Sequence, residues 1–321
     1  MISPCSRRTF LAGSAAFAAS AGAANAADLT GLRLAGAVND DVTPMLYAVA
    51  SGEMRRVGLD LTVDRANSGS AVAAGVVGGA YQIGKSSVAG LITAHARGIP
   101  FVFVAPGGLY ESTAPVVALL ARSDSNIRTG ADLNGKVCAV SAIGDLYTIS
   151  LKAWVDQNGG KSSTLKFIEI PLSAVPAALE AGRIDAGSLE EPAASEALAG
   201  GKVRVIGRPY DAIASHFMYT GWFAMADFAR KNRALLDRFR SGLREATLYT
   251  NTHKTETVEL SAHFAQIDPA IVRRSVRVTA GTALDPKLIQ PMIDCCAKYQ
   301  TIPAPFDARE MIDPNAMPRS A

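Results

Sequence analysis

The sequence is poor in cysteine and histidine and has almost no excess of one charge. Its 321 residues include four cysteines and four histidines, and 32 Lys and Arg oppose 29 Asp and Glu, giving a net charge of +3. This balance provides neither a strong basic field for nucleic acid nor an acidic tail. A hydrophobic content of 49% excludes a disordered chain, and four cysteines are too few for a disulfide-dense scaffold. One large or two medium globular domains remain.

Motifs that carry catalysis or bind metal are also missing. The histidines have no HExxH or Cys/His spacing, and the chain contains no GxSxG or GxGxxG motif. Residues 79–86 match the phosphate-loop pattern letter for letter, but their middle positions are β-prone, whereas a phosphate loop must be flexible. We therefore predict no catalytic centre, no nucleotide site, no metal and no cofactor.

Only the N-terminus has an extended apolar run. Arg7 and Arg8 precede the Ala-rich stretch 10–26, which ends in Ala24-Asn25-Ala26. This is the pattern of a signal peptide, and residues 6–11 resemble the twin-arginine export signal. The stretch is too weakly apolar for a stable membrane span. We expect residues 1–26 to be a twin-arginine-type signal peptide, cleaved near Ala26, and the mature protein to be periplasmic.

Three cysteines remain after that cleavage, Cys138 and the adjacent Cys295 and Cys296. An odd number excludes complete pairing. Buried, free thiols are the first expectation. A disulfide from Cys138 to either member of the pair stays open, because the periplasm is oxidising.

Short β-like runs alternate with helical runs along most of the chain. The expected strands are 32–35, 59–64, 81–83, 100–104, 137–141, 165–170, 184–186 and 203–206. The expected helices include 45–56, 88–97, 146–158, 174–181, 193–198 and a long run over 228–250. Such alternation predicts an α/β protein with doubly wound parallel sheets.

A weak internal repeat suggests two similarly built halves. Gly79–Gly84 and Gly182–Gly187 each place a short strand-like run between two glycines, after an Ala-rich helical stretch. Each half therefore has a helix, a glycine, a strand and a loop in the same order, which favours two α/β lobes.

Several segments, in order, resemble the solute-binding proteins of aliphatic sulfonate, taurine and nitrate importers, a group related to the thiamine-precursor-binding (NMT1/THI5-like) proteins. These segments are 43–48, 52–59, 67–70, 84–87, 131–136 and 178–192. The resemblance implies a type II periplasmic binding protein fold, in which two doubly wound α/β lobes hold a ligand in the cleft between them. Lobe one would comprise residues 27–115 plus 216–321, and lobe two residues 116–215.

The same resemblance implies a set of ligand-binding residues, mostly in loops that follow strands. Lobe one would contribute Asn39, Asp40, Thr43, Ser68, Gly69, Lys85, Ser86 and Ser87. Lobe two would contribute Ser141, Asp145, Thr148, Glu190 and Glu191, and the returning crossover would supply Tyr219 and Trp222 as an aromatic wall. Structural roles compete: Ser68 and Ser141 could only cap helices, and Trp222 could belong to the core.

Two features depart from the family pattern: Lys85 stands where relatives often carry a small or polar residue, and the run Asn39-Asp40-Asp41 is unusually acidic for an anion site. They suggest either a ligand with both signs of charge or a Lys–Asp pair that cancels internally. The cysteine-rich motif of the thiamine-precursor enzymes is absent, which argues against pyrimidine synthesis.

The expected function is that of a periplasmic solute-binding component of an ABC importer. It would bind a small organic anion (sulfonate, taurine-like or carboxylate) and, as a monomer, deliver it to a membrane permease, with no nucleic acid partner. One alternative is a periplasmic enzyme on the same fold, with Asp145 or Glu190 as acid or base. Another is a sensor module.

Overall fold

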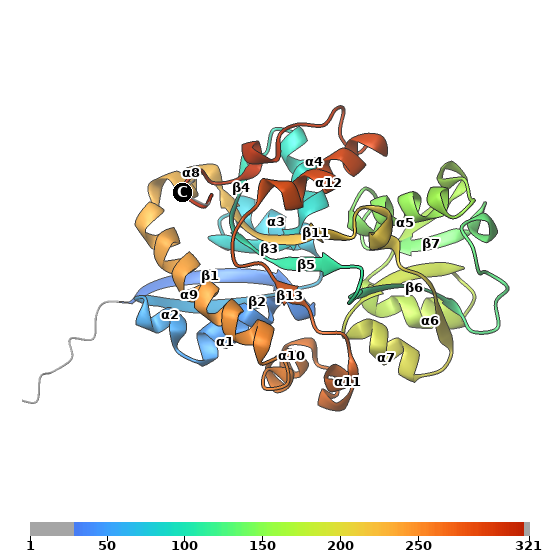
Figure 1. Cartoon of the computed structure of the whole chain (residues 1–321), viewed down its shortest axis with the longest axis horizontal. Coiled ribbons are helices and arrows are strands. Elements are labelled where there is room, and N and C mark those ends of the chain that lie inside the picture. Colours follow the sequence, from blue (N-terminus) through green and yellow to red (C-terminus); the bar gives the residue numbers. More distant parts are fainter. Residues whose placement is uncertain (1–28, 318–321) are drawn as a thin grey trace, which may run out of the picture.

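The computed structural model describes residues 29–317; the predicted signal peptide therefore lies outside the described residues. Two α/β units lie side by side, and crossover segments join them (Figure 1). Lobe one is built on a five-stranded sheet of order β2-β1-β3-β12-β4, and lobe two on a five-stranded sheet of order β10-β6-β9-β7-β8. These names denote each sheet with the helices packed on it; the lobe boundaries at 115/116 and 215/216 remain a prediction.

In lobe one, β1 pairs in parallel with both β2 and β3, whereas β12 runs antiparallel to β3 and β4. The strands are β1 (Thr30–Ala37), β2 (Leu59–Ala66), β3 (Ile83–Ser87), β4 (Phe101–Pro106) and β12 (Thr220–Met225). The helices are α1 (Thr43–Ala50), α2 (Glu53–Arg56), α3 (Gly69–Val77), α4 (Val88–Ala96), α8 (Ala226–Lys231), α9 (Arg233–Thr252), α10 (Val258–Ala265), α11 (Pro269–Arg274) and α12 (Pro286–Lys298).

In lobe two, β7 pairs in parallel with β8 and β9, and β6 runs antiparallel to β9 and β10. The strands are β6 (Val117–Arg122), β7 (Val137–Val140), β8 (Lys166–Glu169), β9 (Ala186–Glu190) and β10 (Val203–Gly207), and the helices are α5 (Leu146–Gln157), α6 (Val175–Glu180) and α7 (Ala193–Ala199). The expectation of purely parallel sheets is therefore wrong. Both sheets are mixed, because β6 and β12 adjoin the crossovers and enter their sheets in the opposite direction.

A small third sheet lies near the crossovers and was not expected from the sequence. Its order is β11 (His216–Met218), β5 (Gly108–Glu111) and β13 (Thr279–Ala280), all antiparallel. The 3-10 turns are η1 (Asp40–Val42), η2 (Ala131–Leu133), η3 (Ser162–Thr164), η4 (Leu172–Ala174), η5 (Pro209–Ala212) and η6 (Ala308–Met311). Of these, η1 and η5 carry residues of the candidate site.

Two of the expected helices are interrupted. The run 45–56 divides into α1 and α2 at Gly52, whose φ of +82° is left-handed and is strained for other residue types. The run 228–250 divides at Asn232 into α8 and α9.

The internal repeat corresponds to matching structure. Gly79 and Gly182 both have positive φ (77° and 66°), and each lies between a helix and a strand, β3 or β9. Counted from these glycines, the strands begin at the same distance, at Ile83 and Ala186. The β3 strand thus shares only Ile83 with the predicted range 81–83 and runs on to Ser87, so Lys85 lies inside a strand and not after one.

The three cysteines of the described residues are free and buried. Cys138 packs in a core cluster of lobe two, whereas Cys295 and Cys296 on α12 pack in a different cluster. The open question of a Cys138 disulfide is thereby answered in favour of free thiols.

Candidate functional site

Lys85 is buried between the central strands of lobe one, and its charge is neutralised there. Its Nζ lies 2.6 Å from Asp41 Oδ2, and both side chains are at most 1% exposed. The hydroxyl of Thr220 donates a hydrogen bond to the same carboxylate. The expectation of a Lys85 charge free for an anionic ligand is therefore not met. The alternative, an internal Lys–Asp pair, is what the structure contains.

Glu190, the last residue of β9, connects the two lobes. Asn39 Nδ2 in lobe one donates to Glu190 Oε2 at 2.6 Å, and the hydroxyl of Tyr210 donates to Oε1 at 2.7 Å. One residue farther along each segment, the backbone N–H of Asp40 reaches the carbonyl of Glu191 at 3.4 Å. Glu190 is only 7% exposed, so this contact excludes most solvent.

The surroundings of Glu190 disfavour its ionised form. Burial is the largest cause and the charge of Asp41 the next, and together they raise the pKa of Glu190 to about 7. Hydrogen bonding by Tyr210, the charge of Lys85 and hydrogen bonding by Tyr147 oppose this rise. A carboxyl group with a pKa near neutrality can accept or release a proton at physiological pH.

Three tyrosines surround this carboxylate. Tyr147 of α5, Tyr210 of η5 and Tyr219 between β11 and β12 are buried, and the rings of Tyr210 and Tyr219 lie 5.7 Å apart. Burial, followed by nearby carboxylates, holds the pKa of each hydroxyl well above its usual value. They are therefore neutral hydrogen-bond donors. Tyr219 belongs to this aromatic group, and its expected contact with a ligand remains a prediction.

Trp222, expected in the same aromatic wall, lies elsewhere. Its side chain is 2% exposed and packs edge-on against Phe239 of α9, with ring centroids 6.1 Å apart, in the core of lobe one. Trp222 is therefore a core residue, as the competing interpretation of the sequence proposed.

The first turns of α3 and α4 meet at Ser86. Ser68 caps α3 and Ser87 caps α4, each accepting a backbone N–H at 3.2 Å. A Cβ on Gly69 would lie 2.3 Å from Ser86 Oγ, so only glycine fits here without a shift of Ser86. Two adjoining helix N-termini bring their positive dipole ends together, a favourable environment for an acid group.

In lobe two, Ser141, Asp145 and Thr148 form a closed hydrogen-bond network at the start of α5. Asp145 caps the helix, accepting from Thr148 N at 2.9 Å and from Ala142 N at 3.1 Å, while the Ser141 hydroxyl also donates to it. Burial raises the pKa of Asp145, and these hydrogen bonds oppose the rise. The helix-start placement is as expected; a contact with ligand remains a prediction.

Glu191 has a comparable structural task at the start of α7. Its carboxylate accepts from the backbone N–H and the hydroxyl of Ser195, at 3.1 and 3.0 Å. Burial raises its pKa, against these two hydrogen bonds. Glu190 and Glu191 are thus adjacent in sequence but differ in task.

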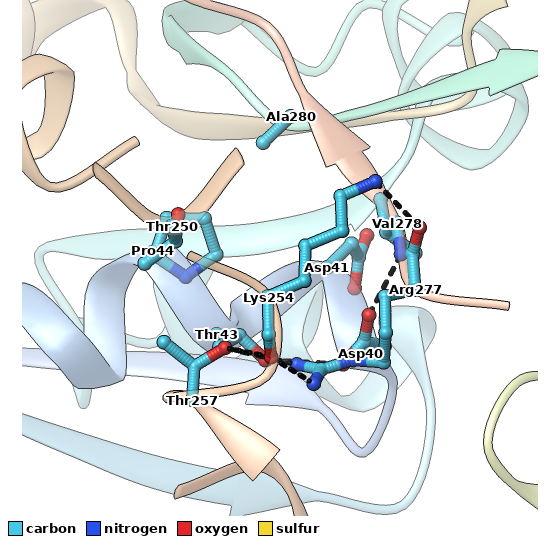
Figure 2. A pocket seen from close by; sticks show the side chains of 10 residues that line it. All are labelled: Asp40, Asp41, Thr43, Pro44, Thr250, Lys254, Thr257, Arg277, Val278 and Ala280. Carbon is cyan, nitrogen blue, oxygen red and sulfur yellow. Dashed lines mark hydrogen bonds and ion pairs between the residues drawn. The ribbon is translucent and has the colours of Figure 1, made fainter. Parts of the chain in front are cut away.

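Asp40 and Thr43 hold the C-terminal part of lobe one (Figure 2). Asp40 Oδ1 accepts from Arg277 Nε and from Ser261 Oγ, each at 2.8 Å, and Oδ2 accepts from Val278 N at 2.8 Å. Thr43 Oγ1 donates to the same carboxylate at 3.2 Å. Since both oxygens are occupied, Asp40 tethers residues 277–278 to η1 instead of offering a free carboxylate, contrary to the expected ligand contact.

The pocket beside Asp40 is small. Its lining includes Lys254 and Arg277, and its volume is about 10 Å³, space for about one water molecule. In this conformation it is too small to hold a solute.

Sequence reasoning missed three residues of the central group. Asp41 was noticed only as part of an acidic run, and Tyr147 and Tyr210 were not selected. Two sequence features could have pointed to the tyrosines: Tyr147 follows the start of a predicted helix, and Tyr210 directly follows a proline. Tyrosines at such positions are also common in hydrophobic cores, so neither feature is specific.

Two further properties of residues 29–317 bear on the site. No group of three or more His, Cys, Asp or Glu side chains is arranged to hold a metal ion there. Within the same range, every helix is too short or too polar to cross a membrane.

A family model matches more than half of the chain. The family model described as NMT1/THI5 like matches residues 39–257. A protein of Escherichia coli (strain K12) named for binding aliphatic sulfonates is 24% identical over 242 residues, which are 73% of each chain.

Solved structures share the fold. The alkanesulfonate-binding protein SsuA of Xanthomonas axonopodis pv. citri, bound to MOPS, has a TM-score of 0.75 at 18% identity over 90% of this chain and 99% of its own. The periplasmic nitrate-binding protein NrtA of Synechocystis PCC 6803 has a TM-score of 0.76 at 13% identity, over 91% and 88%. The expected periplasmic binding protein fold is confirmed.

Proposed function

Since the chain belongs to the NMT1/THI5-like family, we propose that it is the periplasmic solute-binding component of an ABC importer. The observation that carries the proposal is the hydrogen bond between Asn39 and Glu190, which joins the lobes beside buried polar groups. Hinge closure of two lobes around a solute would form and break this contact. It gives the carrier a way to distinguish the loaded from the empty state.

The solute would carry an acid group, as in the sulfonate, taurine-like or carboxylate class. The support for this class comes from the adjoining N-termini of α3 and α4 and from the neutral tyrosine hydroxyls, not from a free lysine charge. Helix N-termini and hydroxyl donors stabilise an anion without adding a full charge to the site.

The cellular setting follows from this role. The chain would be exported through its twin-arginine signal, be cleaved near Ala26, work as a monomer without a cofactor, and hand its solute to a membrane permease. A protein of residues 27–321 is therefore the species to test.

A binding screen of that protein tests the proposal. Sulfonates, carboxylates, nitrate and nucleobases are added singly, and the melting temperature is measured. A ligand at one hundred times its Kd adds about 2.7 kcal/mol to the free energy of unfolding, a readily measured shift. A positive compound is then titrated calorimetrically. Stabilisation by nucleobases alone would contradict the acid class.

A matched pair of variants locates the binding. Gly69→Ala introduces a Cβ that collides with Ser86 Oγ, whereas Gly31→Ala on β1 meets no atom within 4 Å. We expect the first variant to lower affinity at least tenfold and the second to leave it unchanged. Equal affinities would place the acid group away from α3 and α4.

A second function, catalysis by Glu190, is favoured by the pKa of about 7 of this buried carboxyl group. An enzyme would convert the bound solute, and Glu190→Gln would abolish the conversion. Mass spectrometry of the solute after long incubation separates the two functions, because a carrier returns it unchanged.

A further inference from the structure

Two buried cations of lobe one are already paired with carboxylates other than Glu190. Lys85 pairs with Asp41, and Arg277 pairs with Asp40. Within residues 29–317, Glu190 forms no ion pair; its hydrogen-bond partners are the amide of Asn39 and the hydroxyls of Tyr210 and Tyr147, all neutral. A buried carboxylate without a counter-charge is unfavourable, and a ligand of opposite charge can compensate it.

An unsatisfied oxygen of Asp41 independently indicates a place for a hydrogen-bond donor near Glu190. Its Oδ2 contacts Lys85 and Thr220, but its Oδ1 is buried and has no hydrogen-bond partner. Buried carboxylate oxygens in native proteins almost always accept a hydrogen bond. Among the principal causes of the raised pKa of Glu190, the charge of Asp41 is the only charge that raises it. The two carboxylates therefore lie close enough to interact with one ligand group.

A donor placed there would satisfy both carboxylates. A neutral hydroxyl would satisfy the free oxygen of Asp41 and leave the charge of Glu190 uncompensated. A protonated nitrogen supplies several hydrogen bonds together with the compensating charge.

We propose that the solute presents a positively charged nitrogen to Glu190 and Asp41, and that these two carboxylates select zwitterionic acids over plain anions. The inference rests on the proposed function, since it assigns the second charged group of the same solute. The acid group lies toward α3 and α4, and the nitrogen lies toward the end of β9. Glu190 thereby determines specificity through direct contact.

Matched pairs of probes test this selection with the protein of residues 27–321. Taurine is compared with ethanesulfonate, and β-alanine with propionate, by calorimetric titration at pH 8, where Glu190 is ionised. Within each pair only the ammonium group differs. We expect at least one amino compound to bind ten or more times as tightly as its plain partner.

A variant and a change of pH provide two further readouts. Glu190→Gln keeps a hydrogen-bonding side chain but removes the charge, and should reduce the affinity ratio to about one; the exposed Glu180→Gln on α6 of the same lobe should not. In the unmodified protein, the ratio of the affinity for the amino compound to that for its plain partner should decrease from pH 8 to pH 6, because Glu190 takes up a proton. Asp41, Lys85, Tyr147 and Tyr210 are the other groups that face it.

The outcomes are distinct. Tighter binding of the plain anions, with affinity rising as the pH falls, would mean that protonated Glu190 donates to an anion; the inference is then rejected and the solute-binding function stands. Binding of none of the four probes rejects the inference, whereas the melting-temperature screen decides the acid class separately. An amino preference that survives in Glu190→Gln also rejects the inference.

Discussion

Lys85 of β3 and Asp41 of η1 form an ion pair inside lobe one, with Nζ and Oδ2 2.6 Å apart and side chains that are 1% and 0% exposed. Both charges are removed from water, so each depends on the other. Breaking such a pair by removing one partner costs about 3–5 kcal/mol, because an uncompensated charge stays buried. We expect Lys85→Met to lower the free energy of unfolding by about this amount in urea titrations at pH 7.

An exposed pair serves as the control for this prediction. Arg55 and Asp60 lie 3.0 Å apart with side chains 67% and 52% exposed, so Arg55→Ala should change stability little. The double variant Lys85→Met with Asp41→Asn should recover much of the loss. A loss below about 1 kcal/mol in Lys85→Met, the range of exposed pairs, would show that Asp41 is not held as a buried charge.

Stability should depend on pH through Glu190. Its pKa is about 7 in the folded protein against an ordinary value of 4.5, so between these values the folded state holds more protons than the unfolded state. The free energy of unfolding therefore falls as the pH rises through this window, by roughly 3 kcal/mol in total. The contribution is fully present below pH 4.5 and lost above pH 7.

The comparison with Glu190→Gln isolates this effect. Asp145 and Glu191 also have raised pKa values and act in the same direction, so a pH profile of the unmodified protein alone is not specific. Subtracting the unfolding free energies of the two proteins from pH 5 to pH 8 cancels those contributions. The variant should gain relative stability as the pH rises; a flat difference would contradict the assignment.

Loss of the contact between the lobes should weaken solute binding. Asn39→Ala removes the hydrogen bond to Glu190 Oε2 and destabilises the closed arrangement, by about 1.5 kcal/mol for a bond to a charged group. We expect affinity for the solute found in the screen to fall about tenfold. Without solute, small-angle scattering should give a larger radius of gyration for Asn39→Ala than for the unmodified protein.

Asn134→Ala is the matched control. Asn134 Oδ1 accepts from Lys161 N at 2.7 Å, a contact within lobe two, so this variant should retain affinity. Equal losses in both variants would point to general destabilisation rather than to lobe closure.

All three thiols should resist modification in the folded protein. Burial raises the pKa of Cys138 and Cys296 to about 12 and that of Cys295 to about 11, so almost no thiolate is present at pH 8. A thiol reagent should react with none of them under native conditions and with all three in denaturant, without a reductant. If only one thiol reacted after denaturation, the other two cysteines would form a disulfide.

The element order and the repeat could be read from the sequence because both depend on local patterns. Alternating apolar runs, the capping serines and the positive-φ glycines act within a few residues of chain. The expected strands beginning near 59, 137 and 203 and the capping role of Ser68 came from such patterns. The capping role considered for Ser141 was wrong, because Asp145 caps α5 and Ser141 donates to it. The family resemblance added the two lobes, since several short segments recur in one order.

The partners of the charged side chains could not be read in the same way. Asp40 was expected to face the ligand but is tied to Arg277, 237 positions away, and Trp222 faces the core because of the side of β12 on which it falls. The antiparallel entry of β12 also brings Thr220 onto Asp41. None of these contacts has a local signature.

Local patterns in the sequence predicted the α/β alternation, and the order of several short segments indicated the family. The pairing of the buried charges became visible in the folded chain alone. Lys85 is neutralised by Asp41, and Glu190 meets Asn39 across 151 positions and is left without a cation of its own. The reason is physical: periodicity and turn preferences are properties of neighbouring residues, whereas compensation of a buried charge depends on groups that only the folded chain brings within a few ångströms.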